Sequence, residues 1–161
     1  MYFPRMSRKP YHVRRSKTGL GLFAAAPIEN GASIAEYSGP RISSAEAQRR
    51  ERRTGSRYMF EINSRVTIDG SGRGNIGRYA NHACGRAPNA ESTLAKGKII
   101  LRAIKNIRPG DEITYDYGRE YVELFLKTNG GCKCAACVKK RGKKPTLRER
   151  AAAKPRRGRR W

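Results

Sequence analysis

The four cysteines are divided unevenly along the chain, and this division limits how its C-terminal part can fold. Three lie in one short run, Cys132-Lys133-Cys134-Ala135-Ala136-Cys137, and the fourth, Cys84, lies far upstream beside Asn81-His82. Cysteine thiolates at such spacings are typical ligands of a tetrahedral structural zinc ion. We therefore expect all four to bind one zinc ion, which would fasten the C-terminal segment to the body of the protein next to the Asn-His pair.

The length and the ends of the chain indicate one intracellular domain. A chain of 161 residues is long enough for one domain with a modest core. It contains no stretch of about 18 apolar residues that could span a bilayer, and its N-terminus lacks the apolar run of a secretory signal. We expect no membrane contact. In a reducing compartment, clustered cysteines bind metal more often than they form disulfides.

Positive charge dominates the composition, with 36 Lys and Arg residues against 13 Asp and Glu residues and a formal net charge of +23. Such a charge attracts polyanions but does not specify a fold. Residues 141–161 combine dense Lys and Arg with prolines and few apolar side chains, which predicts a disordered basic tail that binds nucleic-acid phosphates. A solubilising tail and a nuclear-entry signal are the alternatives. Residues 1–10 form a shorter basic arm.

Short strands account for most of the predicted core. Residues 34–38, 58–62, 65–69, 98–104 and 112–117 are rich in β-branched or aromatic side chains and are bounded by turn-forming residues. A helix is predicted after Ser43, because Ser43-Ser44-Ala45-Glu46 is a capping-box pattern. A second helix is predicted over 119–127, where three apolar or aromatic side chains share one face.

Two further motifs each have more than one interpretation when taken alone. Gly19-Leu20-Gly21 lacks the third glycine and the strand-helix context of a dinucleotide loop, so it is either a plain turn or a place where backbone approaches another ligand closely. Asn81-His82 either satisfies local hydrogen bonds or binds a ligand. The spacings of Ser-His-Asp hydrolases and zinc proteases are missing from the sequence, which argues against both classes of enzyme.

Five motifs follow one another in a distinctive order. They are Gly19-Leu20-Gly21, then Tyr58-Met59-Phe60, then Ile68-Asp69 with Gly74-Asn75-Ile76-Gly77-Arg78-Tyr79-Ala80-Asn81-His82-Ala83-Cys84, then Pro109-Gly110-Asp111-Glu112-Ile113-Thr114-Tyr115-Asp116-Tyr117-Gly118, and then the cysteine run. This order resembles that of the SET-domain lysine methyltransferases, and the compact size resembles bacterial or viral members. The resemblance implies a mainly β fold, a β-clip of small sheets with short helices and a C-terminal pseudoknot. It implies a SET domain over 11–127 and a zinc-binding post-SET segment over 128–140.

The resemblance also assigns roles to individual residues. Contacts to S-adenosylmethionine are implied for Gly19, Leu20, Gly21, Tyr58, Arg78, Asn81, His82 and Tyr117. The implied catalytic residues are Tyr117 beside the transferred methyl group, Tyr115 at the position that tunes the number of methyl groups, and Tyr58 in the pocket wall. The implied ligands of a structural zinc ion are Cys84, Cys132, Cys134 and Cys137, although the family commonly has four residues, not two, between the last two cysteines.

Methyl transfer to an amine needs alignment and an uncharged nucleophile more than it needs a strong base. The pKa of a free lysine is about 10.4, so desolvation and the sulfonium charge must favour its neutral form. We therefore expect Tyr117 to orient the reactants, with loss of the proton to water. A tyrosinate base is the less favoured alternative, because the reference pKa of tyrosine is about 10. The hydroxyl of Tyr115 would leave less room for a methylated nitrogen, which predicts mono- or dimethylation; the alternative role is that of a core tyrosine on a strand.

The expected substrate is a lysine-containing protein, a histone or a nucleoid-like protein. Acidic residues near the implied catalytic tyrosines suggest a lip that attracts a basic peptide while the tails hold nucleic acid, and the alternative is a solvated acidic helix face. These residues are Asp111, Glu112, Asp116, Glu120 and Glu123. A homodimer is a further expectation, and the expected location is the cytoplasm or nucleoid, or a host nucleus. Two alternatives remain: a catalytically silent module that binds chromatin through its tails, and an enzyme that methylates its own lysine-rich C-terminus.

Overall fold

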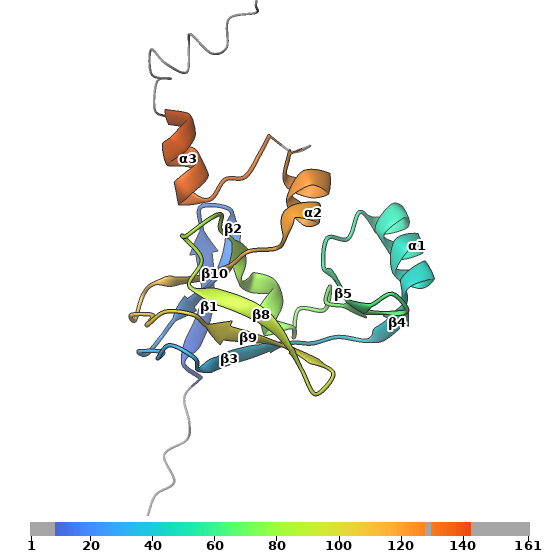
Figure 1. Cartoon of the computed structure of the whole chain (residues 1–161), viewed down its shortest axis with the longest axis horizontal. Helices are drawn as coiled ribbons and strands as arrows, with labels where there is room; N and C mark the ends of the chain where they lie inside the picture. The colour runs from blue at the N-terminus through green and yellow to red at the C-terminus, as the bar shows by residue number, and fades with distance from the viewer. Residues whose placement is uncertain (1–8, 128–129, 143–161) are drawn as a thin grey trace, which may run out of the picture.

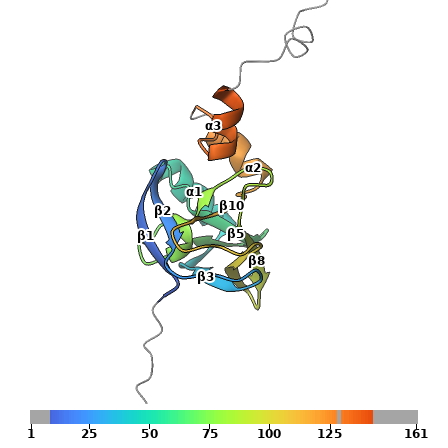
Figure 2. The ribbon, with the colours of Figure 1, turned by 90° about the vertical axis from the view of Figure 1, so that its left-hand side faces the viewer.

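The computed structural model describes residues 9–127 and 130–142, which form three small sheets with short helices at their edges (Figures 1 and 2). The first sheet has the strand order β1 (Tyr11–Ser16), β2 (Gly19–Ala24), β10 (Glu112–Tyr115), β7 (Asn81–His82). The second has the order β3 (Ser33–Tyr37), β9 (Lys98–Ala103), β8 (Ala90–Ala95), and the third has the order β4 (Arg41–Ser43), β6 (Val66–Asp69), β5 (Met59–Asn63). The predicted mainly β fold of small sheets is confirmed.

The first helix, α1 (Ser44–Thr54), begins and ends as its sequence predicts. The Oγ of Ser43 accepts a hydrogen bond from the backbone N–H of Glu46 at 3.2 Å, which satisfies a free donor of the first turn. Gly55 ends the helix in the left-handed conformation, at φ 63°. Arg50 then joins α1 to the third sheet through an ion pair of 2.7 Å with Asp69. This ion pair links α1 to β6, the middle strand of that sheet.

The predicted second helix is present, but it is not regular. A single turn, α2 (Arg119–Tyr121), continues into a π-helical turn, η2 (Val122–Leu126). A π-helical turn displaces the side chains that follow it and is frequent at functional sites. A 3₁₀ turn, η1 (Ile76–Tyr79), precedes β7, and α3 (Ala135–Gly142) follows the cysteine run. In both ribbon views α2 and α3 lie at the same end of the molecule (Figures 1 and 2).

Strand β10 joins two segments that are distant in the sequence. It pairs antiparallel with β2 on one side and parallel with β7 on the other, where Thr114 faces Asn81 and Tyr115 faces His82. Asn89 stabilises this junction, because its side chain accepts from the N–H of Thr114 at 2.9 Å and donates to the carbonyl of Glu112 at 2.8 Å. The junction places the Asn-His motif directly beside the Tyr-Asp-Tyr motif.

The main core lies between the first two sheets. Its largest fully buried side chains are Leu22, Leu101 and Ile113, one each from β2, β9 and β10. No residue beyond Tyr117 belongs to this core among those the structure describes. The sheets therefore do not depend on the C-terminal segment for their packing.

Truncating Ile113 to alanine is expected to lower the free energy of unfolding by about 2–5 kcal/mol, because the cavity left in the core cannot be filled by its neighbours. Ile104, which is 38% exposed, serves as the control and should lose less than about 1 kcal/mol. Denaturant unfolding followed by circular dichroism measures both. Equal losses would contradict the placement of β10 at the centre of the core.

Most of the predicted N-terminal arm and basic tail lie outside the described residues, which exclude 1–8, 128–129 and 143–161. None of the helices in the described ranges has the length and hydrophobicity needed to cross a membrane.

Candidate active site

The junction of β7 and β10 gathers a cluster of aromatic rings. The ring centroids of Tyr115 and Tyr117 are 4.7 Å apart, those of Tyr117 and Tyr121 are 4.9 Å apart, and those of Tyr117 and His82 are 5.3 Å apart. Tyr117 is central to all three contacts. Its hydroxyl donates to the carbonyl of Ala80 at 2.7 Å, which fixes the ring against the Asn-His motif.

His82 connects this aromatic cluster with the cysteines. Its Nδ1 accepts a hydrogen bond from the backbone N–H of Tyr117 at 3.1 Å, so the ring proton is placed on Nε2. Nε2 lies 3.0 Å from the Sγ of Cys84. Burial lowers the pKa of His82, which keeps the ring neutral in this arrangement.

A first hollow of about 460 Å³ is lined by nearly all the residues expected to bind the cofactor. The predicted residues that line it are Gly19, Leu20, Tyr58, Arg78, Asn81, His82 and Tyr117. The C-terminal segment closes the other side with Gly131, Cys132, Lys133 and Cys134. We refer to this space as the donor hollow. Its volume lies within the range of pockets that hold small ligands.

The Gly19-Leu20-Gly21 segment is neither a plain turn nor a free loop. It begins β2 directly after the tight turn at Lys17-Thr18, and Gly19 has a φ of 122°, which side-chain-bearing residues rarely adopt. Leu20 is 53% exposed at the mouth of the donor hollow. Gly21 does not line the hollow but lies behind it, where an added Cβ would approach the Oε1 of Glu112 to 2.6 Å.

Asn81 holds this glycine segment in place. Its Nδ2 lies within hydrogen-bond distance of the Oγ of Ser16, the carbonyl of Leu20 and the Oε1 of Glu112, at 3.1, 3.2 and 2.7 Å. Glu112 thus acts behind the donor hollow as a partner of Asn81. It does not form part of an acidic lip.

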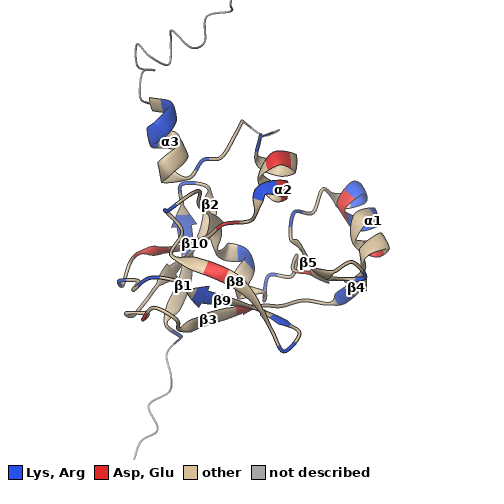
Figure 3. Ribbon diagram, in the orientation of Figure 1, with Lys and Arg blue, Asp and Glu red and all other residues tan. Residues whose placement is uncertain are grey.

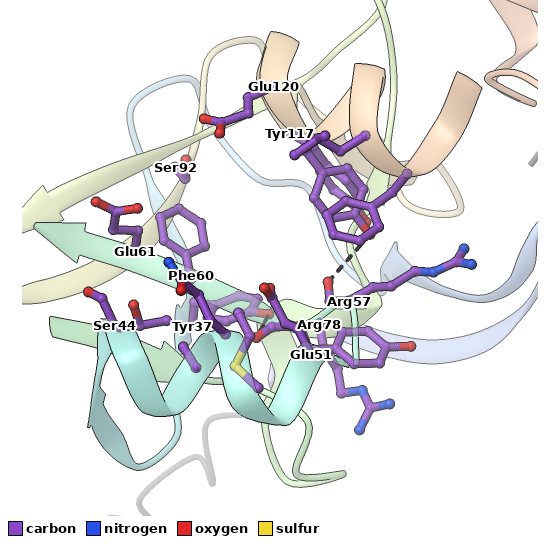
Figure 4. A pocket seen from close by; sticks show the side chains of 18 of the residues that line it. Tyr37, Ser44, Glu51, Arg57, Phe60, Glu61, Arg78, Ser92, Tyr117 and Glu120 are labelled. Carbon is purple, nitrogen blue, oxygen red and sulfur yellow. Dashed lines mark hydrogen bonds between the residues drawn. The ribbon is translucent and has the colours of Figure 1, made fainter. Parts of the chain in front are cut away.

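A second hollow of about 520 Å³ opens on the other side of the tyrosines (Figure 4). Its apolar lining includes Phe60, Leu124 and Phe125, and its polar lining includes Tyr115. We refer to this space as the acceptor hollow. The apolar face predicted for the second helix, formed by Tyr121, Leu124 and Phe125, lines this hollow and is not part of the main core.

The two hollows share one wall. Tyr58, Tyr117 and Tyr121 line both of them, as do Arg57 and Arg78. The guanidinium carbon of Arg78 lies 4.0 Å from the centroid of the Tyr58 ring, and this cation–π contact stabilises the position of the ring. A ligand on one side is therefore separated from a ligand on the other side by little more than tyrosine side chains.

The hydroxyls of the central tyrosines remain protonated. Burial raises the pKa of Tyr115 and raises that of Tyr117 well above its ordinary value. Neighbouring tyrosines add to both shifts. These groups can orient a ligand through hydrogen bonds, but they are poorly suited to act as bases near neutral pH.

The four cysteines meet as predicted. Their Sγ atoms all lie within 4.8 Å of one another, and those of Cys84 and Cys132 are 3.6 Å apart. A tetrahedral Zn²⁺ with bonds of about 2.3 Å separates its sulfur ligands by about 3.8 Å, so the cluster fits this ion. Burial raises the pKa of Cys84. Burial acts in the same direction on Cys134, but hydrogen bonds to its sulfur outweigh this effect and lower the pKa of Cys134 to about 7.

The acidic residues are arranged differently from the predicted lip. Of that set, only Glu120 lines the acceptor hollow, where it is joined by Glu51 from α1 and Glu61 from β5. Glu123 pairs with Arg119 and Lys127 on its own helix. Glu51 and Glu61 could not be found by sequence reasoning, because both lie in segments whose pattern indicates only secondary structure.

Together, these elements form two hollows that share a wall of tyrosine side chains. The chain belongs to the SET-domain family, because the family model described as "SET domain" matches residues 19–118. The resemblance found in the sequence is thus confirmed.

Its relatives are named as histone-lysine methyltransferases. "Histone-lysine N-methyltransferase trithorax" of Drosophila virilis is 39% identical over 123 residues, which are 71% of this chain and 3% of that protein. "Histone-lysine N-methyltransferase, H3 lysine-4 specific" of Candida albicans is 36% identical over 118 residues, which are 68% of this chain and 11% of that protein. The chain thus spans a small part of the length of these relatives.

Solved structures agree with this assignment. The structure described as "ctPRC2 in an autoinhibited conformation bound to S-adenosylmethionine" superposes with a TM-score of 0.62 at 33% identity and covers 70% of this chain and 15% of its own. A second, "Structure of ctPRC2 in complex with H3K27me3 and H3K27M", has a TM-score of 0.63 at 32% identity, with the same coverage.

Proposed function

We propose that this protein transfers methyl groups from S-adenosylmethionine to lysine side chains of a histone or another basic protein bound to nucleic acid. The observation that carries the proposal is the shared wall, which gives the donor and acceptor hollows a common boundary at Tyr58, Tyr117 and Tyr121. The names of the relatives support the choice of acceptor, and the S-adenosylmethionine-bound structural neighbour supports the choice of donor.

Each side of the wall has its own task in this proposal. S-adenosylmethionine, when bound, supplies an electrophilic methyl group. The backbone at Gly19 and Leu20, with Arg78, Asn81 and His82, holds the donor in its hollow. Tyr117 sets the line of approach, because its ring borders both hollows and its hydroxyl is fixed on Ala80. Alignment of this kind removes much of the entropic barrier of a two-reactant step.

The target lysine must lose its proton before it can accept a methyl group. An amine that reaches the buried Tyr115 end of the acceptor hollow would lose hydration, which disfavours its charged form. Tyr117 remains a hydrogen-bonding group, and the proton leaves to water. The reaction needs no metal at the wall, so the zinc ion proposed for the four cysteines is structural, and it would hold Gly131–Cys134 against the donor hollow.

Tyr115 limits the number of methyl groups in this proposal. It is 6% exposed and lines the acceptor hollow. Its hydroxyl has no hydrogen-bond partner among the residues the structure describes, and it is therefore available to a lysine amine or to a water beside it. A methylated nitrogen has fewer hydrogens for that contact and needs more space, so we propose mono- and dimethylated products.

Replacing Tyr115 with phenylalanine is expected to move the product distribution towards trimethyllysine, because the change removes the hydroxyl and its water. Mass spectrometry of one substrate at matched turnover measures the shift. Tyr11→Phe provides the control, since Tyr11 lies on β1 and lines neither hollow. Efficient trimethylation by the unaltered protein would contradict the proposal, and so would an unchanged distribution in Tyr115→Phe.

The activity itself is tested by incubating the protein with labelled S-adenosylmethionine, alone and with histones, nucleosomes or nucleic-acid-bound bacterial proteins. Label on a substrate lysine supports the proposal. If label appears only on the protein's own lysines, the acceptor is its own chain. If the protein binds S-adenosylmethionine but labels no acceptor, it is a catalytically silent binding module. The same assays at two salt concentrations test the predicted contribution of nucleic acid.

A further inference from the structure

Arginines dominate the lining of a third hollow, of about 600 Å³, which lies at the C-terminal end of α1. These arginines are Arg50, Arg53, Arg57 and Arg78. We refer to this space as the arginine hollow. Arg50 and Arg53 line neither the donor hollow nor the acceptor hollow, so the proposed function gives them no task. Figure 3 shows basic residues at this end of α1.

Three of the four guanidinium groups in this lining have no counter-charge. Asp69 is the only acidic residue in the lining, and Arg50 already pairs with it at 2.7 Å. Arg53, Arg57 and Arg78 form no ion pair with a carboxylate in the described ranges. Like charges that share one hollow repel one another, and an anion placed between them would relieve this repulsion.

The lining also contains two buried polar atoms that lack a hydrogen-bond partner, the Oγ of Ser56 and the Nε of Arg78. No other buried side-chain nitrogen or oxygen is unpartnered in the part of the chain that the structure describes. Buried polar atoms are nearly always paired, because an unpaired one has lost its hydrogen bonds with water. A hydroxyl and a guanidinium N–H can both donate, so a ligand with acceptor oxygens would satisfy both atoms.

Arg78 is the fixed member of this set. Its Nη1 donates a hydrogen bond to the carbonyl of Ser71, and Tyr58 holds its guanidinium through the contact described above. Arg53 and Arg57 are exposed, so their side chains can adjust to a ligand whose position Arg78 sets. A guanidinium presents several N–H donors in one plane, which matches the spacing of phosphate oxygens. The arginine hollow is therefore suited to a phosphate group.

Arginine at the C-terminal end of a helix also has an ordinary structural role, which is to complement the helix dipole. This role accounts for Arg53, which lies in the last turn of α1. It does not account for Ser56, Arg57 and Arg78, which lie outside the helix. The helix end carries about half an elementary negative charge, so three unpaired guanidinium groups leave the potential in the hollow positive.

We propose that the arginine hollow binds a phosphate group of a nucleic-acid backbone. The three unpaired guanidinium charges exceed the charge of one phosphodiester, so a chain of phosphates matches them better than a single phosphate does. Arg52 and Arg73 are exposed close in sequence to Arg53 and Ser71 of the lining, and they extend the positive surface. The net charge of +23 favours a polyanion as well. The site belongs to the folded domain and is separate from the basic tails.

The test measures the Kd of the full chain for a short fluorescent DNA duplex by anisotropy, at several salt concentrations. The double variant Arg53→Gln, Ser56→Ala removes two donors that line neither the donor hollow nor the acceptor hollow. It should weaken duplex binding about tenfold, because hydrogen bonds to a charged group have effects of about this size. The slope of log K against log salt should fall in magnitude by about 0.9, which corresponds to one phosphate contact.

Two further variants make the outcome specific. Arg65→Gln removes the same charge from an exposed position that lines none of the three hollows, and it should weaken duplex binding less than about twofold. Arg53→Lys keeps the charge but loses the planar set of donors, so it should keep most of the salt slope and part of the affinity. Circular dichroism checks that each variant is folded. A peptide with one phosphoserine and inorganic phosphate are titrated in parallel as probes of other sources of phosphate.

A double variant that binds the duplex with the same Kd and salt slope as Arg65→Gln would overturn the inference. A double variant that loses affinity for the phosphopeptide or for inorganic phosphate, but keeps its affinity for the duplex, would also overturn it. None of these measurements uses methyl transfer. Failure of the proposed function would instead be seen in the assay with labelled S-adenosylmethionine, so the two outcomes are distinguishable.

Discussion

Replacing Tyr117 with phenylalanine is expected to lower kcat by about a hundredfold to a thousandfold, with little change in the Kd for S-adenosylmethionine. The hydroxyl of Tyr117 is fixed on the carbonyl of Ala80, and its ring borders both hollows. Loss of one preorganised hydrogen-bonding group at a reacting centre has effects of about this size in other enzymes. Single-turnover kinetics and calorimetry separate the chemical step from donor binding.

The pH dependence shows whether Tyr117 is a base. Burial raises its pKa well above the ordinary value, so its hydroxyl keeps its proton across the working range. The rate should rise with pH because the acceptor amine, with a reference pKa of about 10.4, loses its proton. The Tyr117→Phe variant should keep that profile at a lower level, and Tyr11→Phe should match the unaltered protein. A profile that flattens only in Tyr117→Phe would contradict an orienting role, as would an unchanged kcat.

Removing the metal is expected to abolish methylation and to weaken donor binding at least tenfold. The cluster of Cys84, Cys132, Cys134 and Cys137 lies at the point where residues 131–134 close the donor hollow. Without metal this wall would have to form on its own, and a structural zinc site contributes directly to the folding of its segment. Elemental analysis should find one zinc ion per chain, and a chelator should remove the zinc together with the activity.

The sheets should survive this treatment, because the main core contains no residue beyond Tyr117 among those described. Cys134→Ser should therefore lose zinc and activity while keeping the circular dichroism of the sheets. Lys139→Ala, on the exposed surface of α3, serves as the matched control and should behave like the unaltered protein. A metal-free preparation with full activity would refute the proposed role of the cluster.

The strands that could be predicted are those with buried β-branched or aromatic residues. Residues 98–104 and 112–117 have this pattern and correspond to β9 and β10. Strand β1 carries consecutive arginines and is mostly exposed, and β2 has glycine at its first and third positions, so their sequences resemble loops. They are strands because β1 pairs with β2 and β2 pairs with β10, and local propensity cannot report this long-range contact between β2 and β10.

The site could be predicted where it depends on motifs and not where it depends on packing. The residues of the donor hollow and the four cysteines lie in recognisable segments, and the fold brings them together. The position of Gly21 behind the donor hollow, the Asn89 bridge and the presence of Glu51 and Glu61 in the acceptor hollow follow from how strands and helices meet. Tyr121 can be predicted as a helix residue. Its place in the wall of the acceptor hollow cannot be predicted, because it depends on the π-helical turn that follows it.

In the proposed reaction a ligand lies on each face of the tyrosine wall, and this makes the two binding events dependent on one another. Any movement of the Tyr58, Tyr117 or Tyr121 rings that one ligand causes changes the surface that the other ligand meets. Thermodynamic linkage then requires the donor to alter peptide affinity by the same factor by which the peptide alters donor affinity. Such reciprocity would make the strength of the coupling between the two reactants a property of these three rings.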